Sequence, residues 1–200
     1  ISNAAVEGVS YLIRDVMALT HPYGRLQFGE DLELTFDTLI GTGRNPNVAA
    51  AIVIGIEPKW TDQIVEGIAE TGKPVAGFSI ERYGDLKTIE IASRQAMELV
   101  QWASELPREP IELGELMVSA KCGESDTTLG LATNPTVGRV LERMIAEGAT
   151  AIFGETTEVT GGEDLIAAQA VTPEVAAAFM KTFQDYQDFV ISTGADLMGS

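Results

Sequence analysis

Apolar residues recur along the chain in two patterns, and each pattern predicts one kind of element. The longest continuous run is VAAAIVIGI at residues 48–56, which is typical of a parallel strand covered on both faces. Runs of this kind predict strands at residues 15–19, 47–56, 74–80, 116–120 and 149–154. Apolar positions three and four residues apart predict helices, at residues 2–14, 30–42, 60–71, 85–105, 134–147, 163–170 and 172–193.

Strands and helices alternate along most of the chain, and this order predicts an α/β fold. A strand, a crossover helix and a second strand form a right-handed unit in which the strands are parallel. We therefore expect two parallel-sheet, Rossmann-like layers with helices on both faces. Ligands of such sheets bind at the carboxyl ends of the strands. A functional site is expected at that edge.

Several helix ends carry their own signals. Asn134-Pro135 predicts a capping residue followed by proline at the first helical position, and Gly148 is a typical residue for ending the same helix. Thr172-Pro173-Glu174 gives a second start, with a capping threonine and an acidic first turn.

Residues 107–114 hold two prolines and mixed charges, which is typical of a linker. They divide the chain into a first α/β domain, residues 1–106, and a second, residues 115–200. A parallel α/β layer normally starts with a strand. We therefore expect the first domain to lack its first strand, the second to be truncated at its carboxyl end, and the chain to be part of a longer subunit.

Composition narrows the class of partner. Thirteen basic residues against thirty acidic ones give a net charge of −17, which excludes nucleic acid because phosphate binding needs a basic surface. Solubility or a saline habitat is the simplest reason for this charge, but an anionic small-molecule substrate is compatible with it if basic residues gather at the site. No apolar run reaches the roughly 20 residues that span a bilayer, so no membrane association is expected. A single cysteine forms no intrachain disulfide and favours the cytoplasm.

Reactive side chains follow the ends of the predicted strands. His21 stands in a loop after residues 15–19, and Glu57 and Glu81 follow the next two strands. After the strand at 116–120 come Lys121, Cys122, Glu124, Ser125 and Asp126, and Glu155 follows the strand at 149–154. We expect His21 and Cys122 to share one site, within about 13 Å, the radius of a domain.

The basic and sulfur-containing residues of this set each have two interpretations. His21 is either a surface residue or a metal ligand or general base. Cys122 is either a small buried residue or a thiol whose pKa is lowered by Lys121 and by free amides. Lys121 is either a surface cation or a lysine whose charge or lowered pKa serves an anionic substrate.

The acidic residues also have two interpretations. Glu124, Asp126, Glu155 and Glu158 are either ordinary solvated loop acids or, because they converge on one sheet edge, part of a divalent-cation site.

Two motifs carry a resemblance to a known family. Lys121-Cys122-Gly123-x-Ser125-Asp126 is followed eight residues later by Asn134-Pro135-Thr136-Val137-Gly138, a combination that resembles the signature of the altronate/galactarate dehydratase family. The segments 154–158 and 43–48 resemble the same family, so that the resemblance covers nearly the whole chain.

Two departures point to one branch of that family. Arg25 follows Gly24 where the aldarate dehydratases usually have cysteine, and Ile56-Glu57 stands in place of their Cys-Glu pair. These segments are more similar to the large subunits of sulfolactate sulfo-lyases. That resemblance implies a lyase that removes the α-proton of a small anionic hydroxy acid and eliminates sulfite, leaving pyruvate. It also implies Fe(II) or another divalent metal such as Mn(II), a small alpha subunit, and a hetero- or homo-oligomer.

The resemblance assigns roles to residues of this chain. The expected catalytic residues are His21, Lys121, Cys122 and Glu155, of which His21, Cys122 and Glu155 are also the expected metal ligands. The expected substrate-binding residues are Arg25, Ser125, Asp126 and Asn134. A sugar-acid dehydratase and a non-catalytic scaffold are the alternatives.

Overall fold

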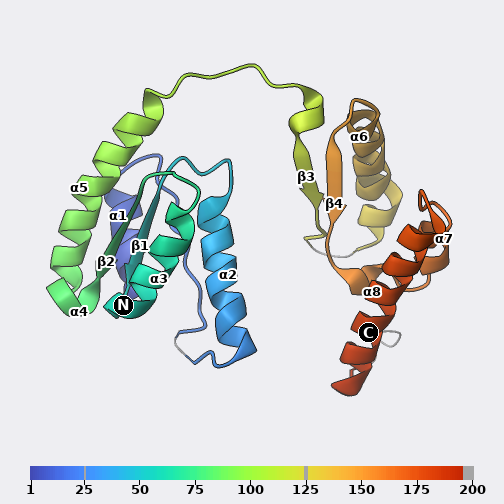
Figure 1. The fold of residues 1–200 in the computed structure, drawn as a ribbon, viewed down its shortest axis with the longest axis horizontal. Helices are drawn as coiled ribbons and strands as arrows, with labels where there is room; N and C mark the ends of the chain where they lie inside the picture. Colours follow the sequence, from blue (N-terminus) through green and yellow to red (C-terminus); the bar gives the residue numbers. More distant parts are fainter. Residues whose placement is uncertain (25, 124–125, 196–200) are drawn as a thin grey trace. The chain divides into compact units, whose positions relative to one another are not determined.

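The computed structural model describes residues 1–24, 26–123 and 126–195 (Figure 1). The chain forms two compact units, Ile1–Arg108 and Glu109–Ser200. In the described residues each unit holds one sheet of two strands. The fold is therefore mixed α/β, with parallel strands in both sheets, as the alternating pattern predicts.

The described residues of the first unit form two strands and five helices. Its elements are α1 (Ser2–Leu12), α2 (Glu30–Arg44), β1 (Ala51–Gly55), α3 (Pro58–Ala69), β2 (Val75–Ser79), α4 (Ile80–Tyr83) and α5 (Asp85–Ser104). Strand β1 pairs with β2 from Ala51 opposite Val75 to Gly55 opposite Ser79. The predicted helices and both of these strands are confirmed to within a few residues at their ends.

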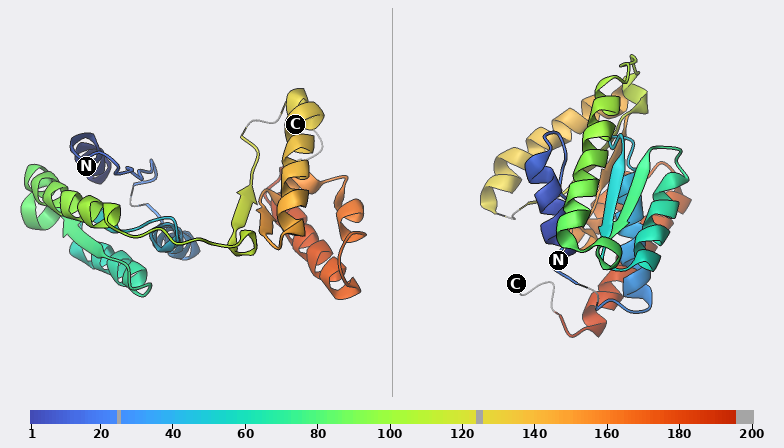
Figure 2. Two further views of the ribbon diagram at one scale, coloured as in Figure 1. Left: turned by 90° about the horizontal axis from the view of Figure 1, so that it is seen from above. Right: turned by 90° about the vertical axis from the view of Figure 1, so that its left-hand side faces the viewer.

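Alternate residues of β1 serve two separate cores. Ile52 and Ile54 pack with Ala5 and Val9 of α1 and with Ala92 of α5. Ala51 and Val53 pack against the cluster that includes Phe36 of α2 and Ile64 and Ile68 of α3. Helices α1 and α5 lie side by side (Figure 2, right). The sheet of this unit is therefore covered by helices on both faces.

The strand predicted at residues 15–19 is absent from the structure. A strand exists only through hydrogen bonds to a neighbouring strand, and among the described residues β1 pairs with β2 alone. Residues 15–19 therefore have the apolar pattern of a strand but no neighbouring strand among the described residues to which they could hydrogen-bond.

Gly55 of β1 packs directly against Thr61 of α3. A Cβ added there would lie 2.0 Å from Thr61 Oγ1 and 3.2 Å from Thr61 Cβ. Thr61 is buried, and its hydroxyl donates to the Glu57 carbonyl at 2.8 Å. We expect Gly55→Ala to lower the free energy of unfolding by about 1–3 kcal/mol through overpacking, measured by urea unfolding.

Gly41→Ala is the matched control for this prediction. Gly41 lies inside α2, and an added Cβ would meet nothing within 4 Å. This variant should be neutral or raise the free energy of unfolding by up to about 1 kcal/mol. Equal stabilities of the two variants would show that Gly55 is not held by close packing.

In its described residues the second unit also combines strands with helices and adds three short helical turns. Its elements are a 3₁₀ turn η1 (Leu113–Glu115), β3 (Met117–Ala120), a π-helical turn η2 (Leu129–Thr133), α6 (Asn134–Ala146), β4 (Thr150–Phe153), a 3₁₀ turn η3 (Thr156–Val159), α7 (Glu163–Ala167) and α8 (Pro173–Ser192). Strand β3 pairs with β4 from Met117 opposite Thr150 to Ala120 opposite Phe153.

Two of the predicted helix ends are confirmed here. Gly148 follows α6 with φ at +94°, a conformation that favours glycine. The Thr172 hydroxyl accepts from Val175 N at 3.3 Å and caps α8, whose first residue is Pro173. Among the described residues, none of the helices combines the length and the apolar character that crossing a membrane requires.

The prediction that β3 is a buried strand is wrong for this chain. Met117 of β3 and Phe153 of β4 are 68% and 56% exposed, and α6 contributes no buried residue. The described elements of this unit cover its two-stranded sheet incompletely, so its apolar side chains remain accessible.

Candidate functional site

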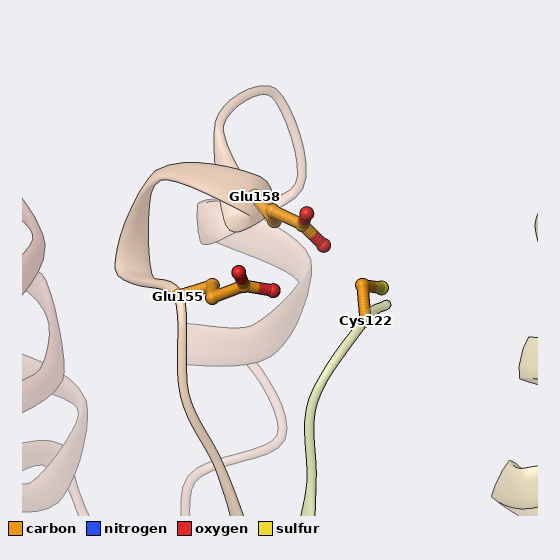
Figure 3. A group of neighbouring side chains, drawn as sticks. All are labelled: Cys122, Glu155 and Glu158. Atoms are coloured by element: carbon orange, nitrogen blue, oxygen red, sulfur yellow. The ribbon is translucent and has the colours of Figure 1, made fainter. Parts of the chain in front are cut away.

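The ends of β3 and β4 bring a thiol and two carboxylates together. Ala120 and Phe153 are paired at the ends of the two parallel strands, and Cys122 and Glu155 each follow two residues later. One oxygen each of Glu155 and Glu158 and the Cys122 sulfur all lie within 4.8 Å of one another. Both carboxylates point toward Cys122 (Figure 3). This cluster is the centre of the candidate site.

Lys121 adds a cation to the cluster. Its Nζ atom donates to Glu155 Oε1 at 2.6 Å and to the Cys122 carbonyl at 3.2 Å. The Glu155 carboxylate raises the pKa of Lys121, and the Lys121 ammonium holds the pKa of Glu155 below its usual value. The alternative of a lysine with a lowered pKa is therefore wrong, and Lys121 brings a positive charge to the site.

The environment of Cys122 also differs from the sequence interpretation. The hydrogen-bonded Glu158 carboxylate, followed by burial, raises the pKa of the Cys122 thiol, and Lys121 opposes this only weakly. The expectation of a pKa lowered by Lys121 is wrong because two carboxylates stand closer to the thiol than the sequence could show. In this arrangement the sulfur is held as a thiol.

Glu155 has an unusual backbone. Its φ angle is +66°, in the left-handed region, which costs a non-glycine residue about 1–3 kcal/mol. The turn η3 begins at the next residue, and Glu158 N donates to the Glu155 carbonyl at 2.9 Å. Glu155 and Glu158 are three residues apart in the sequence, and this turn brings their side chains to the same side (Figure 3). The sequence grouped Glu158 with the loop acids, and its spacing from Glu155 is the signal that could have assigned it to the site.

Asp126, and not Asn134, caps the helical segment that leads into α6. Asp126 Oδ1 accepts from Thr128 N at 2.7 Å and from Leu129 N at 3.2 Å. Hydrogen bonds from Thr128, first from its hydroxyl, and from the Leu129 backbone lower the pKa of Asp126. Because the helical backbone begins before the π-helical turn η2, Asn134 lies inside the helix. The prediction that Asn134 is an N-cap is wrong.

Asn134 instead lines a hollow shared with the cluster. The hollow has a volume of about 290 Å³ and is lined by Cys122, Asp126, Leu129, Gly130, Asn134 and Glu158. The two sequence motifs therefore meet at one concave surface. Ser125, which was expected to bind substrate, lies outside the described residues, as does Glu124.

His21 belongs to the first unit. Its carbonyl accepts from Asn3 Nδ2 at 2.7 Å, and its Nδ1 atom is buried without a hydrogen-bond partner in the described part of the chain. A buried imidazole nitrogen without a hydrogen-bond partner can coordinate a metal ion or accept a proton. His21 and Cys122 belong to different units, so the site that they are expected to share stays a prediction. Arg25 lies outside the described residues.

Comparison with known proteins assigns both units of the chain to domains of one family. The family described as "D-galactarate dehydratase/Altronate hydrolase, second domain" matches residues 2–104, and "D-galactarate/Altronate dehydratase, C-terminal" matches residues 113–200. No solved structure matches the chain significantly.

Individual curated relatives fall in two groups. The "(2R)-sulfolactate sulfo-lyase subunit beta" of Chromohalobacter salexigens is 58% identical over 95% of this chain and 49% of its own length. "Altronate dehydratase" of Bacillus subtilis is 28% identical over 88% of this chain and 36% of its own length, and that of Escherichia coli is 31% identical over 76% and 31%. The chain thus spans about half, or less, of the curated relatives it matches.

Proposed function

The chain belongs to the D-galactarate/altronate dehydratase family, and from this premise we propose that its protein is the large subunit of a carbon-sulfur lyase acting on (2R)-3-sulfolactate. The observation that carries the proposal is the 58% identity, over almost the whole chain, to a protein named as a sulfolactate sulfo-lyase subunit. The clustered thiol, carboxylates and ammonium supply the groups that such a reaction needs. The proposed reaction yields pyruvate and sulfite.

The donor atoms at the cluster fit a divalent cation. A bound cation would displace the proton of the Cys122 thiol, and the sulfur would then join the carboxylate oxygens of Glu155 and Glu158 as ligands of Fe(II) or Mn(II). These three residues would hold the metal, and His21 would join them if the complete protein brings its Nδ1 atom to the same place. A bound divalent cation would stabilise negative charge that develops on the substrate carboxylate.

The residues of the chain divide the remaining work. Lys121 is protonated beside Glu155, so it holds an anionic group of the substrate and does not act as the base. His21 and Glu155 remain the two proposed acceptors of the α-proton. As the proton leaves the α-carbon, its electron pair forms the C=C bond, the C–S bond breaks, and sulfite departs with the bonding electrons. The enol product becomes pyruvate, and no oxidant or reductant is needed.

A sugar-acid dehydratase is the second candidate, favoured by the two altronate dehydratases among the relatives. The mechanism is the same with hydroxide as the leaving group. A non-catalytic scaffold is the alternative of another class. The proposed compartment is the cytoplasm, where the single cysteine stays reduced.

One experiment separates these functions. The complete subunit, with its proposed small partner and Fe(II), is incubated with (2R)-3-sulfolactate, and sulfite and pyruvate are measured. Equal amounts of both products are expected. Turnover of altronate or galactarate without sulfite release would favour the dehydratase. A protein that turns over neither acid and binds neither Fe(II) nor Mn(II) would be a scaffold.

A further inference from the structure

The first unit contains a long cavity beside β1, on the side away from β2. Its volume is about 680 Å³. Residues 47–57, which include all of β1, line one side of it, and the lining also includes Asp15, Val16, Met17 and Leu19. Helices α1 and α5 contribute to the lining from one face of the sheet, and α2 and α3 from the other. The cavity therefore continues the plane of the sheet between two layers of helices.

The edge of β1 that faces this cavity has no strand beside it in the described residues. Ala51 N donates to the carbonyl of Pro74, which directs the backbone of Ala51 and of alternate residues toward β2. In a parallel strand the residues between them direct their N–H and C=O groups to the opposite side. The backbone groups of Ile52 and Ile54 therefore face the cavity. Leaving such groups buried without partners is costly.

The sequence of β1 contradicts its position at a sheet edge. The run VAAAIVIGI is apolar on both faces, a pattern of central strands. Edge strands normally carry charges, proline or bulges that prevent further pairing, and residues 48–56 have none of the charges or prolines. Pattern and backbone thus agree that β1 is built to have a strand on each side.

We propose that this cavity is the seat of one further β-strand, parallel to β1 and supplied by the part of the same polypeptide that lies outside residues 1–200. The incoming strand would pair with Ile52 and Ile54 on one side. On its other side it would pair with residues 15–19, whose strand-like pattern has no partner strand in the part of the chain that the structure describes. The sheet would then have four strands.

Two observations favour a strand of the same polypeptide over one from another molecule. The curated relatives are at least about twice as long as the matched segment, so in those proteins further residues of the same polypeptide could supply the strand. Ile1, Ser2 and Asn3 line the cavity together with His21 and Glu57, which mark the carboxyl edge of the sheet. A parallel strand in the cavity ends at that edge, next to the start of α1, and this is the arrangement of a strand and a helix in a βα unit.

The consequence for function is the position of His21. It follows residues 15–19, so pairing of that segment would fix His21 about 10 Å, two strand spacings, from the end of β1. The proposal concerns the fold of the first unit and holds whichever acid the protein uses. Its failure would therefore leave the proposed reaction untouched.

Residue-resolved hydrogen exchange on the complete protein tests the proposal. The amides of Ile52 and Ile54 should be protected to within about tenfold of those of Val53 and Gly55, which face β2 and serve as internal controls. The protection should persist when the protein is diluted to monomer and when the small subunit is absent. Fast exchange at Ile52 and Ile54 would show an open edge, and protection lost on dilution or without the partner would assign the strand to another molecule. Either result would overturn the proposal.

Discussion

Glu155→Gln in the complete, metal-loaded enzyme is expected to lower kcat for sulfite release at least about 100-fold, the usual contribution of a positioned acid or base. Glutamine keeps the size of the side chain but cannot accept a proton, and it is a poor metal ligand. It also removes the charge that pairs with Lys121 at 2.6 Å. The measurement is steady-state kinetics with sulfolactate, together with Mn(II) affinity by calorimetry.

The two roles proposed for Glu155 give different results in that pair of measurements. A ligand role predicts weaker Mn(II) binding along with the loss of kcat, whereas a base role predicts the loss of kcat with binding nearly unchanged. Glu147→Gln is the matched control. Glu147 is an exposed carboxylate at the carboxyl end of α6, whereas Asn134 of the candidate site lies at the start of that helix. This variant should change kcat by less than about twofold. If Glu155→Gln behaves like this control, Glu155 has no part in the reaction.

The sequence predicts the elements of this chain well where local signals act without competition. Gly148 ends α6 in a left-handed conformation, and Thr172 with Pro173 starts α8, because each signal depends only on nearby backbone. The parallel pairing of β1 with β2 and of β3 with β4 follows from the strand and helix order. Lys121 and Glu155 could be brought together by the same rule, since both follow ends of adjacent strands.

What the sequence could not show depends on contacts between distant residues or on competing local signals. Asn134-Pro135 is a sound capping signal, but Asp126 caps the helical segment eight residues earlier and leaves Asn134 inside it. The pKa of Cys122 depends on Glu158, whose distance is set by the left-handed backbone of Glu155. The segment at residues 15–19 has the pattern of a strand but no partner strand among the described residues, so its apolar pattern alone is not sufficient to form a strand.

Arg25→Ala is expected to reduce kcat/KM for sulfolactate by roughly 10- to 150-fold, equivalent to about 1.5–3 kcal/mol for a charge-assisted bond to the sulfonate. Arg25 lies outside the described residues, so this role rests on the sequence: it stands where the dehydratases usually have cysteine, in a chain with 13 basic residues against 30 acidic ones. Guanidinium can bind a sulfonate or a carboxylate through paired hydrogen bonds, and a thiol cannot. The measurement is kcat/KM with sulfolactate and, separately, with a sugar acid.

Arg25→Lys separates geometry from charge in this prediction. A lysine restores the positive charge without the paired geometry, so it should recover only part of the lost kcat/KM. Arg94→Ala serves as the control, since Arg94 is an exposed residue of α5 paired with Glu90, and it should stay within about twofold of the parent. A folded, metal-loaded Arg25→Ala enzyme with unchanged kinetics would mean that Arg25 is a solvated loop residue. The argument for a sulfonate over a sugar acid would then rest on sequence identity alone, because Arg25 is the one residue proposed to distinguish the two leaving groups.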